Sequence, residues 1–147
     1  MRKILLAVFA LSLALCGGAL AADAPEKKDI SMGFVYVSPV GDAGWSYSHD
    51  LARQKLDEDP SITTYYVESV PEGADSERVI LNMARKGYDI IVTTSFGYMD
   101  PTMKVAADYP KLTFLHCSGY KTADNVSNYF GRMYQARYLT GLVAGSM

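Results

Sequence analysis

The run ISMGFVYV at residues 30–37 determines which fold class the chain can adopt. It contains no charged side chain, and its polar residues do not alternate regularly with its apolar ones. A strand with one face in water alternates between the two kinds, whereas a parallel strand covered by helices on both faces is apolar almost throughout. We therefore predict a buried parallel strand at 30–37.

Runs of the same kind recur along the chain. They are TTYYVESV at 63–70, YDIIVTT at 88–94, LTFLHC at 112–117 and a shorter one, VSNYF, at 126–130. Segments expected to form helices separate the first four runs, and the runs are spaced as βαβ units require. We predict an α/β fold, a doubly wound parallel sheet flanked by helices, with ligands bound beyond the carboxyl ends of the strands.

The first connecting helix is expected at 45–56, and a last helix is expected to run from residue 132 to residue 147. Within the first helix, Leu51, Ala52 and Leu56 fall along one side. An apolar side of a helix normally packs against the sheet. We therefore expect these three residues to be buried.

Capping residues predict where the second and third helices begin. Asp75 or Ser76 suits the N-cap of the second helix, and Gly87 suits the left-handed residue that follows its last turn. In the third helix, Asp100 can cap while Pro101 fills the first helical position, where a missing N–H costs nothing.

The chain opens with the features of a secretory signal peptide, predicted at residues 1–21. Arg2 and Lys3 precede an apolar segment that ends in small residues and is too short for a stable membrane span. Residues 22–147 then form the exported, periplasmic or extracytoplasmic domain. The LALC sequence ending at Cys16 resembles a bacterial lipobox, so two alternatives stay open: soluble export, or a lipid anchor at Cys16.

Composition argues against several classes of function. The formal net charge of −2 provides no basic surface, so we expect no nucleic-acid partner. No pair of His or Cys residues has metal-ligand spacing, so we expect no metal or other cofactor. If Cys16 leaves with the signal peptide, Cys117 is the one remaining cysteine and no internal disulfide is expected.

An enzymatic function is weakly supported, and we predict no catalytic residues. The chain has two histidines, His49 in the first helix and His116 in the fourth strand, and both are expected in the core. A periplasmic hydrolase using His116 and Cys117 is an alternative. However, neighbours in a strand point to opposite faces, which separates the two side chains.

The loop SPVGDAGW at 38–45 lies between a strand and a helix, where free backbone N–H groups can hold a phosphate. It lacks the glycine spacing and the lysine of a phosphate-binding loop, and Asp42 would repel an anion. Three interpretations remain: a phosphate loop, a plain turn, and a loop that recognises a neutral polar ligand. We favour the last.

Aromatic residues in the loops support a planar ligand. Trp45 at the end of the first loop and Phe96 after the third strand are candidate stacking surfaces. Asp42, Ser95 and Ser118 are candidates to hydrogen-bond the edge of such a ligand. These five residues form the predicted site, although Trp45 alone would also suit a purely structural position.

Taken together, GFVYVSPVGDAGWSYSHD, TTSFGYMDP and GYKTADNVSNYFGRMYQARYLTGLVAG, with the export signal, resemble the basic membrane protein family. This family comprises substrate-binding proteins of ABC transporters and includes purine-nucleoside-binding lipoproteins. The resemblance extends over residues 30–147. It implies one lobe of a type I periplasmic-binding-protein fold, in which two lobes close over the ligand at a hinge.

The resemblance also implies a function. The expected ligand is a purine nucleobase or nucleoside, stacked between aromatic residues of the two lobes, and the expected partners are ABC permease subunits. Residues 42–45 and 95–98 would supply this lobe's half of the pocket. Family members that bind nucleosides tend to have aspartate after the fourth strand, where this chain has Ser118, and that favours a nucleobase.

Two points about organisation follow from the resemblance. The second, C-terminal lobe of the family is missing, so we expect a truncated lobe with weak binding and no transport by itself; the alternative is a lobe that acts with a partner chain. A different role is also compatible with the sequence: a periplasmic ligand-sensing module that serves a membrane receptor.

Overall fold

The computed structural model describes residues 29–147. The predicted signal peptide and the lipobox cysteine, Cys16, lie outside these described residues. None of the helices in residues 29–147 is long and apolar enough to cross a membrane.

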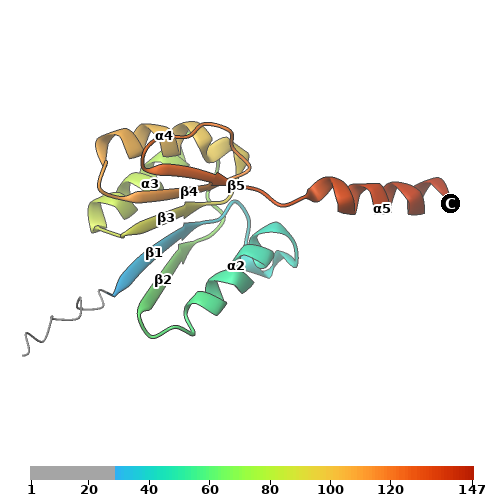
Figure 1. Ribbon diagram of the computed structural model, residues 1–147, viewed down its shortest axis with the longest axis horizontal. Helices are drawn as coiled ribbons and strands as arrows, with labels where there is room; N and C mark the ends of the chain where they lie inside the picture. Colours follow the sequence, from blue (N-terminus) through green and yellow to red (C-terminus); the bar gives the residue numbers. More distant parts are fainter. Residues whose placement is uncertain (1–28) are drawn as a thin grey trace, which may run out of the picture.

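Five strands form one parallel sheet in the order β2-β1-β3-β4-β5 (Figure 1). They are β1 (Ile30–Val35), β2 (Ile62–Val67), β3 (Ile90–Thr93), β4 (Thr113–Cys117) and β5 (Val126–Tyr129). The chain passes from β1 to β2 on one side and then returns to β3 on the other side of β1. This reversal defines a doubly wound sheet, so the predicted fold class is confirmed.

Helices cover both faces of the sheet (Figure 1). They are α2 (Trp45–Leu56) on one face, α3 (Ala74–Lys86) and α4 (Met99–Asp108) on the other, and α5 (Met133–Gly145) beyond the sheet. Two short 3₁₀ turns, η1 (Val40–Asp42) and η2 (Phe96–Tyr98), precede α2 and α4. Both turns follow strand ends, so they help to build the loops at the carboxyl edge.

The face under α3 and α4 contains the larger apolar core of the described residues. Ile80 and Met83 of α3 are buried there in one cluster with Phe114 of β4. A Cβ atom at Gly33 would lie 2.8 Å from the sulfur of Met83. The glycine in β1 therefore allows α3 to approach the sheet closely.

On the other face, α2 turns a different side toward the sheet from the one predicted. Leu51 is 45% exposed and Ala52 is exposed, so their predicted burial is wrong, whereas Leu56 packs against the core. The buried residues of α2 are polar, Ser46 and Asp50. Apolar spacing alone did not reveal which side of α2 faces the sheet.

A polar network explains this rotation of α2. Asp50 is 5% exposed and accepts hydrogen bonds from Arg53 Nε at 2.5 Å and Gln54 Nε2 at 2.7 Å, with the Tyr36 hydroxyl at 3.5 Å. The guanidinium of Arg53 also lies 4.9 Å from the ring centre of Tyr66. Burial raises the pKa of Asp50, but the hydrogen bonds and charge of its partners outweigh burial and lower that pKa overall.

The strand at the β2 edge is not buried as predicted. In β2, Tyr65 and Tyr66 are 50% and 42% exposed, and Val67 is also exposed. β2 pairs with β1 on one side only, because it lies at the end of the sheet. The apolar run correctly predicted a strand but did not distinguish an edge strand from a central one.

Helix starts differ from the predicted caps. The residue before α3 is Gly73 rather than Asp75 or Ser76, and the residue before α4 is Tyr98 rather than Asp100. α4 continues directly from η2, so its chain enters the helix already coiled. The predicted end of α3 is confirmed, because Gly87 adopts a left-handed φ of 81°.

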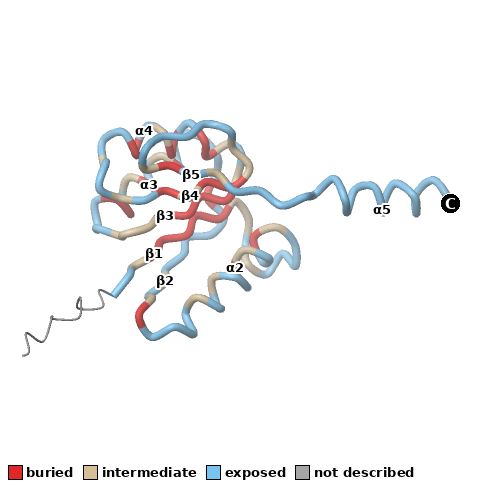
Figure 2. Tube along the Cα trace, viewed as in Figure 1, coloured by how far each residue is buried: buried red, intermediate tan, exposed pale blue. Residues whose placement is uncertain are grey.

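The last helix is confirmed, with ends at Met133 and Gly145. It extends away from the sheet and its helices (Figure 1), and Figure 2 shows it exposed along its whole length. The apolar side chains Leu139, Leu142 and Val143 are 62%, 55% and 62% exposed. α5 therefore adds nothing to the core of the described lobe.

Candidate ligand-binding site

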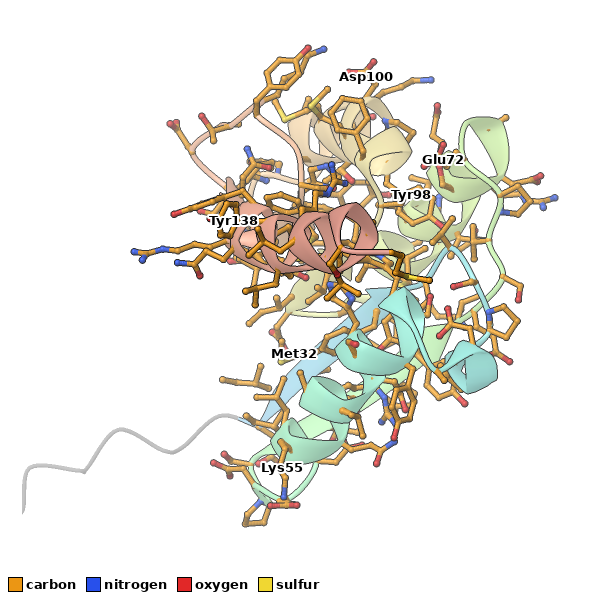
Figure 3. The ribbon with its side chains drawn as sticks, turned by 90° about the vertical axis from the view of Figure 1, so that its right-hand side faces the viewer. Met32, Lys55, Glu72, Tyr98, Asp100 and Tyr138 are labelled. Carbon is orange, nitrogen blue, oxygen red and sulfur yellow. The ribbon has the colours of Figure 1, made fainter. Side chains whose placement is uncertain are left out.

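The loops with the predicted site residues all leave the same edge of the sheet. Because the five strands are parallel, their carboxyl ends meet at this edge, which Figure 3 views from the side of α5. Glu72 and Tyr98 lie together on one part of this edge, and Asp100 lies beyond them (Figure 3). The predicted loops are thus on one surface.

Asp42 organises the loop after β1. Its Oδ1 accepts hydrogen bonds from the backbone N–H groups of Gly44 at 2.7 Å and Tyr47 at 3.2 Å. Its Oδ2 accepts one from the Ser38 hydroxyl at 2.5 Å, and this bond is the main reason that the pKa of Asp42 is lowered. A phosphate would need the same amides at the start of α2, so this geometry argues against the phosphate loop.

Trp45 is fixed in place at the end of that loop. Its indole Nε1 donates a hydrogen bond to the carbonyl oxygen of Thr94 at 2.6 Å, which holds the half-buried ring beside the end of β3. The ring centre lies 4.8 Å from that of His49 and 6.5 Å from that of Phe130. Trp45 therefore has a structural hydrogen bond and also belongs to an aromatic group at the edge.

The loop after β3 is held by Glu72, a residue that the sequence did not single out. Glu72 Oε1 accepts hydrogen bonds from the Ser95 hydroxyl at 2.5 Å and from the Gly97 amide at 3.1 Å. Phe96, between them, is 56% exposed, and its ring centre lies 6.5 Å from that of Tyr120. Glu72 thus holds the loop in the shape that exposes Phe96.

Ser118 begins the loop after β4. It has a left-handed φ of 69°, and its hydroxyl donates to the carbonyl oxygen of Cys117 at 2.5 Å. Its backbone N–H donates to the carbonyl oxygen of Tyr129 at 3.0 Å. The hydroxyl protons of Ser118 and Ser95 are both used inside the protein, so each hydroxyl meets a ligand chiefly as an acceptor.

His116 and Cys117 do not form a catalytic pair. His116 is buried, and its Nδ1 lies 2.9 Å from the hydroxyl oxygen of Thr93. Cys117 is buried on the other face, where burial raises the pKa of its thiol, the opposite of activation. Within residues 29–147, no group of His, Cys, Asp or Glu side chains could hold a metal ion.

The expectation that both histidines lie in the core is confirmed for His116 and wrong for His49. Burial lowers the pKa of His116, so the neutral form is favoured. His49 is half-buried beside Trp45, and its ring centre lies 6.3 Å from that of Tyr129. Trp45 lies one helical turn before His49, on the same side of α2.

The structure therefore groups the edge residues into two aromatic pairs. Trp45 lies with Phe130, and Phe96 lies with Tyr120; both partners were missed, and they are 60% and 72% exposed. Position was the signal that could have identified them, because Phe130 is the last residue of the predicted run at 126–130 and Tyr120 lies shortly after the one at 112–117. Exposed aromatic rings that gather at one edge of a sheet are candidates for contact with a ligand or a partner.

Comparison with known proteins identifies the family. Residues 29–147 match the family described as ABC transporter substrate-binding protein, PnrA-like. The chain belongs to this family. Its members are extracytoplasmic substrate-binding proteins of ABC transporters rather than enzymes.

Three similar proteins support the assignment. A purine-binding protein of Brucella abortus is 50% identical over 90% of this chain and 37% of its own length. A Haloferax volcanii protein named as an ABC transporter glucose-binding protein is 45% identical over 82% of this chain and 31% of its own length. A solved ABC transporter solute-binding protein of Aeropyrum pernix has a TM-score of 0.68 at 27% identity, over 78% of this chain and 32% of its own.

The PnrA-like chain thus spans about a third of the length of these proteins. It aligns with solute-binding proteins over a single lobe, which agrees with the fold that the resemblance implied.

Proposed function

We propose that this lobe binds a purine nucleobase or nucleoside as part of an extracytoplasmic solute-binding protein of an ABC uptake system. The observation that carries the proposal is the placement of Trp45. Its ring is held at the carboxyl edge by the Thr94 carbonyl and lies 6.5 Å from the exposed ring of Phe130. Aromatic rings at a fixed edge suit a flat ligand, and a relative that is 50% identical is named as purine-binding.

The charges near the edge support a neutral ligand. Asp42 already occupies the amides at the start of α2, and Glu72 lies at the neighbouring loop. Lys121, a cation on the next loop, is paired with Asp100 at 2.6 Å. A nucleotide phosphate would meet carboxylates at the loops after β1 and β2, so we propose a nucleobase or nucleoside. We favour the nucleobase, because the resemblance implies an aspartate in nucleoside binders where this chain has Ser118.

We also propose that the lobe acts together with a second lobe and with permease subunits. The longer relatives have the length for a second lobe, and a two-lobed protein can close around its ligand. A closed form can signal occupancy to a permease, whereas a single lobe buries one side of the ligand. The alternative role, a sensing module for a membrane receptor, would use the same pocket as the transport role. The two roles differ only in the membrane protein that the lobe contacts.

The proposal can be tested through Trp45, because it is the one tryptophan in the sequence. Adenine, guanine, adenosine and glucose are titrated separately against the purified chain while tryptophan fluorescence is recorded. We expect adenine or guanine to change the emission in a saturable way and glucose to leave it unchanged. A response to glucose alone would favour a sugar, in line with the Haloferax relative, and no response to any purine would contradict the proposal.

A further inference from the structure

The hydrogen bond of His49 determines what its second ring nitrogen can do. His49 Nδ1 lies 2.8 Å from the carbonyl oxygen of Trp45, one turn earlier in α2. A carbonyl oxygen can only accept, so Nδ1 must carry the proton. In the neutral imidazole, Nε2 is then an unprotonated acceptor, and it has no hydrogen-bond partner within residues 29–147.

The position of this free acceptor links it to the candidate site. The His49 ring centre lies 4.8 Å from that of Trp45 and 6.3 Å from that of Tyr129, at the last residue of β5. His49 is half-buried, so it is partly shielded from water yet still accessible. The bond to Trp45 prevents free rotation of the imidazole, which gives the acceptor a defined direction.

Other groups on α2 do not compete for Nε2. The nearby side-chain donors on the helix, Arg53 and Gln54, both donate to the Asp50 carboxylate on the side that faces the sheet. The aromatic neighbours Trp45 and Tyr129 are themselves occupied. The indole N–H of Trp45 is donated to Thr94, and the hydroxyl of Tyr129 interacts with Cys117. Water, or the donor of a ligand that displaces it, is therefore the remaining partner for Nε2 among the described residues.

We propose that His49 is a specificity-determining residue whose Nε2 accepts a hydrogen bond from an N–H group of the ligand. This inference rests on the proposed purine-binding function and adds to it a residue that stacking alone does not require. A free purine base presents donors of this kind on its ring and, in adenine, on its amino group. His49 thus selects for ligands with an N–H at the edge that faces α2.

Two matched substitutions separate the acceptor from the rest of the side chain. In His49→Asn, the amide can still donate to the Trp45 carbonyl, but no atom remains where Nε2 lies. In His49→Gln, the longer side chain can place its carbonyl oxygen near the position of Nε2. Both variants are compared with the wild-type chain by circular dichroism, to verify folding, and by adenine titration followed through Trp45 fluorescence.

We expect His49→Asn to weaken adenine binding by about tenfold, because it loses one hydrogen bond. In His49→Gln, the dissociation constant should stay within about threefold of the wild-type value, because that bond can still form. Two purine analogues then show which N–H group of adenine donates to His49. 9-Methyladenine lacks the N–H of the five-membered ring, and unsubstituted purine lacks the amino group. The ligand that lacks the recognised donor should bind wild type and His49→Asn equally.

The outcomes distinguish this inference from the proposed function. If the wild type binds no purine, the proposed function fails and the inference with it. If the wild type binds adenine and a folded His49→Asn binds it equally well, the inference is wrong and the proposed function stands. Equal losses in His49→Asn for adenine and for both analogues would also overturn it, because the effect would then be structural.

Discussion

The two faces of the sheet are built in different ways. Under α3 and α4, eleven buried residues form a continuous core, whereas the cluster under α2 has four. The α2 face has fewer buried apolar residues, and it is held instead by polar contacts, chiefly those of Asp50, and by aromatic side chains near the loops. The comparison indicates that the α3–α4 face supplies most of the apolar burial, while the α2 face carries Trp45 and the polar contacts beside it.

The largest expected effect lies in the α3–α4 core. Phe114 is fully buried there, so Phe114→Ala should lower the free energy of unfolding by about 3–5 kcal/mol. The matched control on the α2 face is Leu51→Ala, where the side chain is 45% exposed and the change should stay within about 0.5 kcal/mol. Urea unfolding followed by circular dichroism measures both. Similar losses in the two variants would remove the distinction between the faces.

A somewhat smaller effect is expected from the polar contacts of α2. Asp50→Ala removes one of the two carboxylates that pair with the largely buried Arg53, and Asp57 remains as the other. Loss of these charged hydrogen bonds should cost about 2 kcal/mol. Leu51→Ala, the next position, again serves as the control. A loss below about 1 kcal/mol for Asp50→Ala would show that the network does not hold α2 on the sheet.

The same carboxylate predicts a pH dependence. The pKa of Asp50 is lower in the folded protein than its ordinary value of 3.8. The unfolded state therefore binds the proton more tightly, so this stabilisation is present above pH 3.8 and is lost as the pH falls through the lowered value. Between neutral and acidic pH, the free energy of unfolding should fall less steeply in Asp50→Asn than in the wild type. An identical pH profile would contradict this assignment.

At the carboxyl edge, a smaller change should affect the loop after β4. A Cβ atom at Gly119 would lie 2.2 Å from Cδ2 of the buried His116, so Gly119→Ala must displace the loop or the ring. We expect a loss of about 1–3 kcal/mol in unfolding free energy. Gly41→Ala is the control, because no atom lies within 4 Å of the added carbon. Equal stability of the two variants would show that the loop is not packed on His116.

The smallest effect concerns Asp42 on the loop after β1. Ser38→Ala removes the hydrogen bond that contributes most to lowering the pKa of Asp42, so this pKa should rise toward its ordinary value. Carbon-detected NMR titration of the carboxylate measures the change. Ser48→Ala, an exposed hydroxyl elsewhere in α2, should leave it as in the wild type. An unchanged pKa in Ser38→Ala would mean that the backbone donors alone hold the carboxylate.

Much of the fold could be predicted from the sequence because apolar runs identify central parallel strands directly. The prediction failed where tertiary position decides. TTYYV is rich in strand-forming residues, so nothing in it indicated that β2 is an edge strand. Likewise, the rotation of α2 depends on the contacts of Asp50 with Arg53 and Gln54, which helical periodicity does not describe.

The candidate site was predictable in outline and not in its contacts. Strand ends placed Trp45 and Phe96 at one edge, because the carboxyl ends of parallel strands meet there. Their partners Phe130 and Tyr120 could not be assigned, since these pairings join loops that are distant in sequence. His49 was assigned to the core although it is only half-buried, because its contacts with Trp45 and Tyr129 depend on tertiary packing.

We propose that the carboxyl edge of the sheet, around Trp45, binds a purine base. The most direct measurement is an NMR titration of the isotope-labelled chain with adenine, in which the single indole N–H signal reports on Trp45. We expect saturable shifts of this signal and of the Phe96 and Ser118 amides, with the Tyr65 amide on the edge strand β2 unaffected. Shifts confined to Tyr65 and its neighbours, or no saturable shift anywhere, would contradict it.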